Sequence, residues 1–272
     1  MNNARDLYDE RFRKGYRASL SGYEVARWHA LRHLITRILR RQDARVVLDY
    51  GSGSGLHVDL WNTVFPEADL YFCDISGVAL DKLRKSYPRY AANCALVEHD
   101  AAGFRDNLFD VVVSVEVMEH VEHLEAYLRD VLRLLKPNGC FVWTTPCGNI
   151  LSIEHAYAAL MGKIETTEEG YRRWRFEDPS HLRRLKSREI EEMMKSLGFR
   201  DIGFRFRAHF FSFLSDRFLR GRMRKVGDNL MRLDYSLFRR LPNGASMIGY
   251  AVKPDLSSGL ARCISQIRKE RR

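Results

Sequence analysis

The sequence has no long apolar run and no secretion signal. Nowhere in its 272 residues do about eighteen apolar residues follow one another, the length that a helix needs to cross a bilayer. The polar start, from Met1 to Asp6, lacks the apolar core of a signal peptide. We therefore expect a cytoplasmic protein and leave peripheral contact with a membrane open.

Cysteine is also scarce. The five cysteines are scattered without C-x-x-C spacing, and the first three fall in or beside apolar, strand-like runs. An odd set of this kind favours neither a disulfide framework nor a zinc site. We expect free thiols, most of them buried, at Cys73, Cys94, Cys140, Cys147 and Cys263.

Acidic residues are outnumbered by basic ones. With 45 Lys and Arg against 35 Asp and Glu, the chain carries a formal net charge of +10. Such an excess favours an anionic partner, which can be a nucleic acid, an anionic membrane surface or a phosphorylated substrate. A plain solvated basic surface explains the same charge equally well, so charge alone selects no partner.

The most informative stretch runs from Arg45 to Leu56. A β-branched run, Val46 to Leu48, reads as a buried parallel strand and is followed by glycines at alternate positions. Glycine permits a sharp turn and lets a ligand approach the main chain closely. The pattern predicts a nucleoside cofactor, although a plain tight turn also gives such spacing. The three glycines are Gly51, Gly53 and Gly55.

An acidic residue stands where a nucleoside would need it. Leu70 to Cys73 reads as the next strand, and Asp74 follows at its carboxyl end, about twenty residues beyond the glycines. A carboxylate at this point can accept hydrogen bonds from both ribose hydroxyls. Asp74 therefore favours a bound nucleoside over a plain turn.

Strand-like and helix-like segments alternate from residue 45 onward. This βαβ order predicts an α/β fold with a doubly wound, seven-stranded, mostly parallel sheet whose ligand binds at the carboxyl ends of the strands. The predicted strands are 46–50, 69–73, 95–98, 109–114, 140–144, 199–207 and 245–252. The predicted helices lie near 55–64, 76–86, 121–135 and 187–197.

Five short motifs occupy the predicted strand ends in succession. They are L-D-Y-G-S-G-S-G from Leu48, C-D-I-S from Cys73, H-D-A from His99, F-D-V-V-V-S-V-E-V-M-E-H-V from Phe109 and L-L-K-P-N-G-C from Leu134. In order and spacing they resemble the motifs of class I S-adenosylmethionine-dependent methyltransferases. The resemblance is strong over about residues 45–147 and weaker over 180–252. A nicotinamide-binding protein would share only the first two motifs.

The resemblance implies that the cofactor is S-adenosylmethionine and that the last strand enters the sheet antiparallel. In this family the glycine loop holds the methionine end, the acidic residue after the second strand binds the ribose, and a later aspartate accepts from the adenine amino group. Tyr50 departs from the small or apolar residue more usual at its position. The implied cofactor-binding residues are Asp49, Gly51, Ser52, Gly53, Asp74, Ile75, Asp100, Ala101 and Val115.

The acceptor chemistry is expected just beyond the fourth strand. Methyl transfer from a sulfonium is an in-line displacement that needs alignment and removal of a proton from the acceptor. His120 is the candidate general base, because imidazole titrates near neutrality, and Glu116 is the second candidate catalytic residue. Glu119 and His120 can instead simply begin a helix.

The same stretch, Glu116-x-x-Glu119-His120, resembles the metal-assisted pattern of ubiquinone-pathway O-methyltransferases and of RNA-terminal ribose methyltransferases. Two carboxylates and an imidazole can hold a divalent ion that acidifies a hydroxyl. We predict a site without metal and keep this variant as an alternative. The histidine that would complete a metal site is one of His123, His155 and His181.

The two ends of the chain lie outside the predicted sheet. Residues 1–44 read as an N-terminal helical cap whose aromatic side chains, Tyr16 and Trp28 foremost, can close over a cofactor. Packing alone explains most of these aromatic residues as well. Residues 255–272 read as a basic tail.

The methyltransferase domain is predicted over 45–254, with insertions at 146–182 and 208–243 that form the acceptor pocket or a lid. In the second insertion an aromatic and aliphatic face is bordered by arginines. A helix lying in a membrane interface has this character, and so has a dimer contact or a cap over the pocket. Peripheral membrane contact through 208–240 and a homodimer both stay open.

The predicted function is methyl transfer from S-adenosylmethionine to a hydroxyl or amine of a small or lipid- or sugar-linked metabolite. An RNA methyltransferase is the first alternative. The charge favours it, but a recognisable RNA-binding appendage is missing, so a nucleic-acid partner is disfavoured without being excluded. A catalytically silent subunit that only binds the cofactor is the second alternative.

Overall fold

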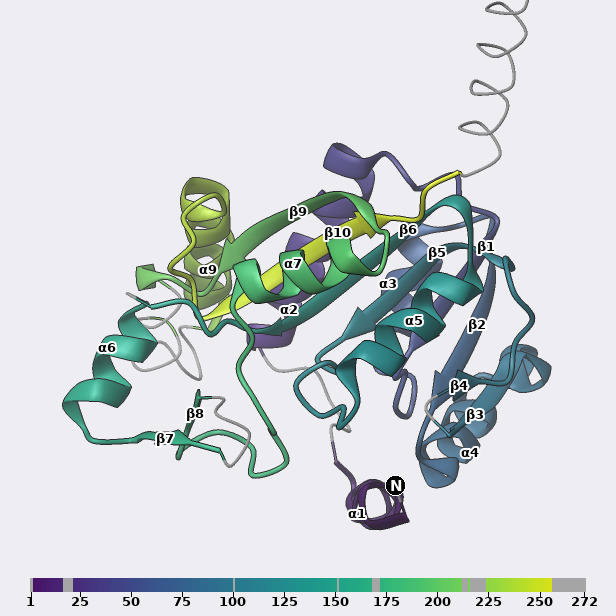
Figure 1. Ribbon diagram of the computed structural model, residues 1–272, viewed down its shortest axis with the longest axis horizontal. Helices are drawn as coiled ribbons and strands as arrows, with labels where there is room; N and C mark the ends of the chain where they lie inside the picture. Colours follow the sequence, from purple (N-terminus) through teal and green to yellow (C-terminus); the bar gives the residue numbers. More distant parts are fainter. Residues whose placement is uncertain are drawn as a thin grey trace, which may run out of the picture.

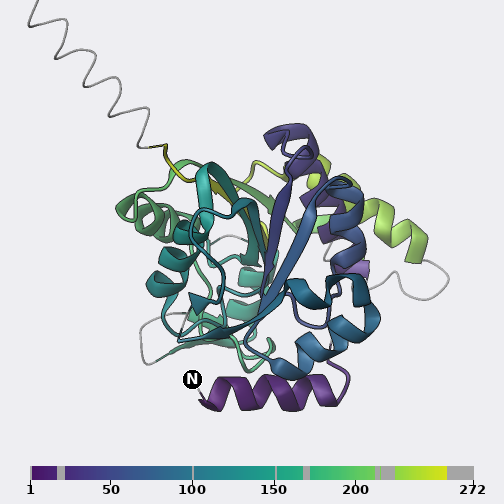
Figure 2. The same cartoon turned by 90° about the vertical axis from the view of Figure 1, so that its right-hand side faces the viewer.

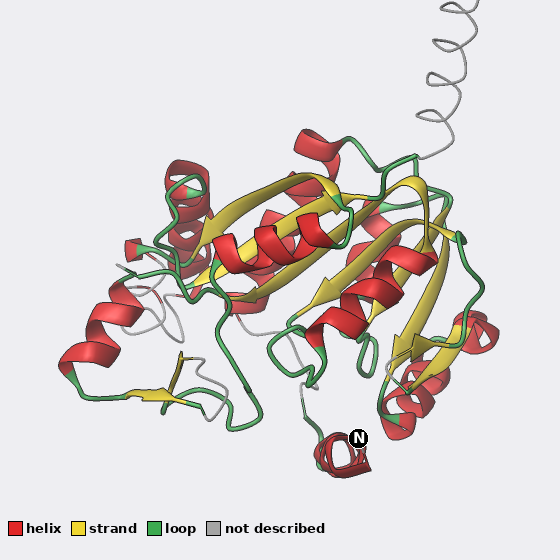
Figure 3. Ribbon diagram, viewed as in Figure 1, coloured by secondary structure: helices red, strands yellow, loops and turns green. Residues whose placement is uncertain are grey.

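A single sheet forms the centre of the molecule and carries helices on both faces (Figure 1; Figure 3). The described helices include none that is long and apolar enough to cross a membrane. The predicted tail beyond Asp255 lies outside the described residues. The structure, a computed structural model, describes residues 2–16, 22–99, 101–150, 152–167, 172–211, 215 and 224–255.

The strands of this sheet are β1 (Val46–Tyr50), β2 (Asp69–Asp74), β3 (Cys94–Glu98), β4 (Ala101–Ala102), β5 (Phe109–Val115), β6 (Leu135–Pro146), β9 (Arg200–Arg207) and β10 (Ser246–Val252). Their order is β4-β3-β2-β1-β5-β6-β10-β9. Strands β3, β2, β1, β5 and β6 are parallel, whereas β10 pairs antiparallel with both β6 and β9. The predicted doubly wound sheet with an antiparallel last strand is confirmed. The additional strand is the two-residue β4, which pairs antiparallel with β3.

Helices cover the two faces of the sheet as the βαβ order requires. One face carries α2 (Gly22–His33), the π-helical turn η1 (Leu34–Leu39), α3 (Val58–Val64), α4 (Gly77–Ser86) and α9 (Arg224–Phe238). The other face carries α5 (Leu124–Leu134) and α7 (Ser187–Ser196). A short 3-10 helix, η2 (Pro88–Asn93), precedes β3.

Successive residues of each strand enter opposite cores, which is why the predicted strands read as continuous apolar runs. Val47 packs on the α3 side and Leu48 on the α5 side. Val111 and Val112 of β5 divide in the same way. Because side chains alternate along a strand, a strand that is buried on both faces must be apolar at every position.

Two further segments lie beyond the sheet edges. Helix α1 (Asn2–Arg13) crosses below the carboxyl ends of the parallel strands, as Figure 2 shows. The insertion that follows β6 contains α6 (Ile153–Leu160) and a small hairpin of β7 (Ile164–Thr166) and β8 (Arg172–Trp174). In Figure 1 this insertion extends away from the sheet.

The described part of the 208–243 insertion packs against α2. Tyr235 of α9 is 3% exposed, and its hydroxyl donates to the Ala30 carbonyl at 3.4 Å. Leu237, on the other side of α9, is 59% exposed. Residues 216–223, which hold part of the predicted arginine border, lie outside the described residues. Contact with a membrane through this insertion therefore stays a proposal.

Candidate cofactor and acceptor site

A pocket opens at the carboxyl ends of β1, β2 and β5, where the sheet topology places the ligand of such a fold. Its walls come from the loops after these three strands and from one side of α1. Eight residues that the sequence predicted for the site line it together: Gly51, Ser52, Gly53, Asp74, Ile75, Val115, Glu116 and His120.

Gly51 and Gly53 of the glycine loop both have a positive φ and both lack space for a Cβ. Gly51 has a φ of +81°, and a Cβ there would collide with the side chain of Val117. Gly53 also has positive φ, and a Cβ on it would lie 3.1 Å from the ring of Phe12 in α1. The Gly51 amide donates to the Cys73 carbonyl at 2.8 Å, which fastens the loop to the end of β2.

Asp74 joins the glycine loop to the start of α4. Its two carboxylate oxygens accept from the amides of Gly53 and Ser76, each at 2.8 Å. The side chain is buried, and this burial raises the pKa of Asp74 to about 6, although the amide bonds oppose the rise. Ribose binding by Asp74, which the resemblance implies, stays a prediction, and the side chain lines the pocket where it would act.

Glu116 follows β5 with a backbone φ of +55°, which is rare for a residue with a side chain. Its carboxylate accepts from the Thr144 hydroxyl at 2.8 Å and pairs with Arg27 of α2 at 3.0 Å. The side chains of this ion pair are only 5% and 9% exposed. Glu116 is therefore fixed at the pocket wall, and its charge is balanced by a buried guanidinium.

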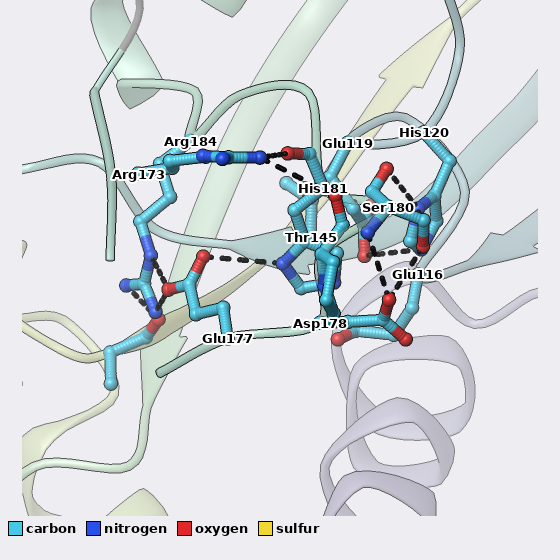
Figure 4. A network of polar contacts seen from close by, with 12 residues as sticks. Glu116, Glu119, His120, Thr145, Arg173, Glu177, Asp178, Ser180, His181 and Arg184 are labelled. Carbon is cyan, nitrogen blue, oxygen red and sulfur yellow. Dashed lines mark hydrogen bonds and ion pairs between the residues drawn. The ribbon is translucent and has the colours of Figure 1, made fainter. Parts of the chain in front are cut away.

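His120 lies in the same wall, and Ser180, which is not a lining residue, fixes the orientation of its ring. Its Nδ1 is 3.0 Å from the Ser180 carbonyl oxygen. A carbonyl only accepts, and the Ser180 hydroxyl oxygen, 3.2 Å from the same nitrogen, gives its own proton to Asp178. In the neutral ring this network assigns the proton to Nδ1 and leaves Nε2 as the basic nitrogen. Nε2 lies 3.9 Å from Oε1 of Glu119, a fully buried carboxylate (Figure 4).

His181 completes a cluster with Glu119 and His120. One ligand atom of each residue lies within 4.8 Å of the others. Thr145 donates to Oε2 of Glu119 at 3.1 Å, and Glu177 accepts from Nδ1 of His181 at 3.2 Å. Burial lowers the pKa of His181, but the bond to Glu177 and the charge of Glu119 outweigh it and raise this pKa. Partners of this kind orient metal ligands in proteins, so the geometry fits a divalent cation.

Two of the predicted cofactor residues that the structure describes, Asp49 and Ala101, are not among the residues that line the pocket. Asp49 is buried beneath α3, where it accepts from the Trp61 indole at 2.7 Å, and burial raises the pKa of Asp49 to about 7. Ala101 begins β4 and is not among the lining residues described. Asp100 lies outside the described residues.

The N-terminal segment supplies one side of the pocket, including three residues that were not singled out from the sequence. Ala4, Tyr8 and Phe12 of α1, and Tyr16 three residues beyond its end, line the pocket. Of the two aromatic residues singled out from the sequence, only Tyr16 is a lining residue. Trp28 does not line the pocket but contacts a residue that does. Its indole donates to Nδ1 of His57 at 2.9 Å, and His57 lines the pocket.

Comparison with known families identifies the chain. Residues 23–203 match the family model described as a methyltransferase domain, which covers more than half of the sequence. The chain therefore belongs to the methyltransferase-domain family. It is an S-adenosylmethionine-dependent methyltransferase, as the fold and the glycine loop already indicated.

Curated relatives match a smaller part. The ubiquinone/menaquinone biosynthesis C-methyltransferase UbiE of Pseudomonas aeruginosa strain PAO1 is 33% identical over 142 residues, which are 46% of this chain and 55% of the relative. The enzyme of the same name from Desulfotalea psychrophila is 28% identical over 108 residues, 39% of this chain and 44% of the relative. The chain thus spans about half the length of the curated relatives it matches.

Solved structures share the fold along most of the chain. A Haloferax volcanii methyltransferase, solved in complex with the Trm112 methyltransferase activator, has a TM-score of 0.60 at 18% identity and covers 91% of this chain and 98% of its own. A Thermotoga maritima methyltransferase reaches 0.55 at 15% identity, with coverage of 93% and 100%. At these identities the likeness establishes the fold alone.

Proposed function

We propose that the enzyme transfers the methyl group to a hydroxyl or amine of a small or lipid- or sugar-linked metabolite and that His120 removes the proton of the acceptor. The observation that carries this proposal is the position of His120, which lines the same pocket as the glycine loop and Asp74. Its Nδ1 is held by Ser180, so Nε2 is the nitrogen that can accept a proton.

The remaining residues of the pocket serve binding and alignment. When bound, S-adenosylmethionine supplies the activated methyl group. The glycine loop would hold its methionine end and Asp74 its ribose, and the side chains of Phe12 in α1 and Tyr16 just after it exclude water from one side. Because Arg27 already balances Glu116, this carboxylate is better suited to orienting an acceptor than to taking its proton.

The curated relatives are named C-methyltransferases of quinone biosynthesis. Their name favours a carbon nucleophile as a third acceptor type to be tested beside oxygen and nitrogen.

Two variants test the role of His120. His120→Asn should reduce methyl transfer by about a hundredfold or more once an acceptor is found by radiolabel screening, because general base catalysis contributes on this scale. His123→Asn, which changes an exposed histidine three residues away, should keep the rate. Affinity for S-adenosylhomocysteine, measured by calorimetry, should be the same in both. A fully active His120→Asn enzyme would refute the proposal.

A metal-assisted transfer is the second candidate, and the cluster of Glu119, His120 and His181 favours it. Two imidazoles and one carboxylate suit manganese, zinc or ferrous ions better than magnesium. A bound cation would acidify an acceptor hydroxyl. Glu116 is a poor fourth ligand because Arg27 and Thr144 already occupy its oxygens.

Calorimetric titration with Mn²⁺ or Zn²⁺ decides between the two candidates. If the transfer is metal-assisted, the protein should bind the cation, and this affinity should fall about tenfold or more in Glu119→Gln and His181→Asn but not in His123→Asn. Chelator should then also abolish methyl transfer. Absence of binding by the parent protein, together with a chelator-insensitive rate, would leave the metal-free mechanism.

A further inference from the structure

Helix α1 reaches a distant loop through one arginine. Arg11 donates to Asp178 from both terminal nitrogens, with Nη1 3.0 Å from Oδ2 and Nη2 2.6 Å from Oδ1. The paired side chains are only 22% and 21% exposed. Tyr16 adds a hydrogen bond from its hydroxyl to Oδ2 of Asp178 at 3.2 Å. A bidentate pair of this geometry is both strong and directional.

Asp178 in turn shapes the turn that contains Ser180. Its Oδ1 accepts from the Ser180 amide at 2.9 Å and from the Ser180 hydroxyl at 2.7 Å. Arg11 Nη1 also donates to the same hydroxyl, at 2.9 Å. An aspartate that bonds the amide two residues ahead fixes the backbone between them. Asp178 therefore decides where the Ser180 carbonyl points.

That carbonyl is the partner of His120. Nδ1 of His120 lies 3.0 Å from the Ser180 carbonyl oxygen, as Figure 4 shows, and the carbonyl obliges this nitrogen to carry the proton. From the α1 side, Tyr8 packs its ring edge against His120 with 5.7 Å between centroids. A neutral imidazole held in this way keeps the lone pair on Nε2, the nitrogen that a base needs here.

We propose that Arg11 and Asp178 are positioning residues that set the tautomer of His120. The inference rests on the proposed function, in which His120 accepts a proton at Nε2. Free imidazole side chains prefer to carry the proton on Nε2, where they cannot accept another. Docking of α1 onto Asp178 thus converts His120 into the accepting form at the same time as α1 closes the cofactor pocket.

Residues beside Arg11 in the same half of α1 tie the helix to the cofactor side. Asp9 accepts from the Ser76 hydroxyl at 2.5 Å, and Ser76 also donates its amide to Asp74. Lys82 of α4 donates to the Phe12 carbonyl. Helix α1 therefore contacts Ser76, which is bonded to Asp74, and also the turn at Ser180 that orients His120. This arrangement allows the base to be set only when the pocket is closed.

Histidine nitrogen NMR tests the proposal without knowledge of the acceptor. Long-range ¹H–¹⁵N spectra at about pH 8, above the ordinary pKa of histidine, report which ring nitrogens carry a proton. His120→Asn identifies the signals of His120. The variants are Arg11→Gln and Asp178→Asn, and Arg13→Gln, an exposed arginine of the same helix, is the matched control. All samples contain chelator, so that no metal fixes the tautomer, and saturating S-adenosylhomocysteine.

We expect the parent protein and Arg13→Gln to show His120 protonated at Nδ1. In Arg11→Gln and Asp178→Asn the ratio of tautomers should move toward Nε2–H by about fivefold or more, the equivalent of one lost hydrogen bond. Arg11→Lys should restore part of the parent ratio. Because the two variants act from different elements, a folded spectrum of either one decides the result. An unchanged ratio in the folded variants, or an equal change in Arg13→Gln, would overturn the proposal.

The outcome is separable from that of the proposed function. If His120→Asn retained full methyl transfer, His120 would not be the base, whatever the NMR spectra showed. If the tautomer ratio were insensitive to Arg11 and Asp178, the role of His120 would stand and only the positioning role would fall.

Discussion

Asp74 joins the glycine loop to α4 and is also the residue that we propose to bind the ribose. The affinity for the cofactor should therefore depend on the protonation of Asp74. Burial raises the pKa of Asp74 to about 6. If Asp74 binds the ribose as we propose, its ionised form accepts hydrogen bonds from the two hydroxyls, whereas its protonated form must donate one. Binding of S-adenosylhomocysteine should therefore weaken as pH falls below about 6, by up to about tenfold per pH unit. Calorimetry between about pH 5 and pH 7 measures this dependence.

Asp69, at the other end of β2, provides the control for this prediction. Asp69→Asn removes an exposed carboxylate at the opposite end of β2 and should leave the pH dependence intact. Asp74→Asn should bind more weakly at every pH and lose the dependence. If the affinity of the parent protein were constant over this range, Asp74 would not be the titrating contact.

Residues at strand ends could be predicted from the sequence because an apolar run marks each strand that they follow. Gly51, Gly53 and Asp74 follow apolar runs directly, and the backbone of a parallel sheet brings such ends together. Asp178 and Ser180 gave no comparable signal. Their partners in α1 lie more than 160 positions earlier, and no local pattern encodes a pairing over that distance.

At the scale of secondary-structure elements, the buried strands were the most predictable. β1 was predicted at its observed bounds, and β2 and β3 to within one residue. Most residues of β1 and β2 are buried and mainly apolar, and the partly buried β3 keeps the apolar run from Ala95 to Val97. The insertions were less predictable. The hairpin of β7 and β8 has only three residues in each strand, I-E-T and R-R-W, which is too short to show an alternating apolar pattern even though Trp174 is buried.

The packing of α9 on α2 gives a prediction at this scale. Tyr235→Ala should lower the free energy of unfolding by about 3 kcal/mol, because it empties a buried site and removes the hydrogen bond to Ala30. Leu237→Ala, on the exposed side of α9, should change it by less than about 0.5 kcal/mol. Urea unfolding measures both. Equal losses would mean that α9 does not dock through this side.

The charge of the whole molecule bears on its partners. A net charge of +10 and exposed apolar residues on α9 support our proposal of contact with an anionic membrane surface. The protein should sediment with phosphatidylglycerol vesicles at low salt and be released at about 0.5 M salt, where charges more than a few ångströms apart are screened. Leu237→Glu should reduce the bound fraction.

Neutral phosphatidylcholine vesicles are the control for this experiment. Binding to both kinds of vesicle alike would indicate plain apolar adhesion rather than charge recognition. No sedimentation with anionic vesicles at low salt would remove the membrane partner and leave packing as the purpose of the 208–243 insertion.

The separation of 167 positions between Arg11 and Asp178 also has a consequence for biosynthesis. A ribosome adds on the order of ten residues per second, so the glycine loop and Asp74 are made many seconds before the partner of Arg11 exists. Val115, Glu116 and Tyr127, which also line the pocket, are made within that interval, and Asp178 follows them. We therefore expect the contact between Arg11 and Asp178 to be the last part of the site to form during synthesis.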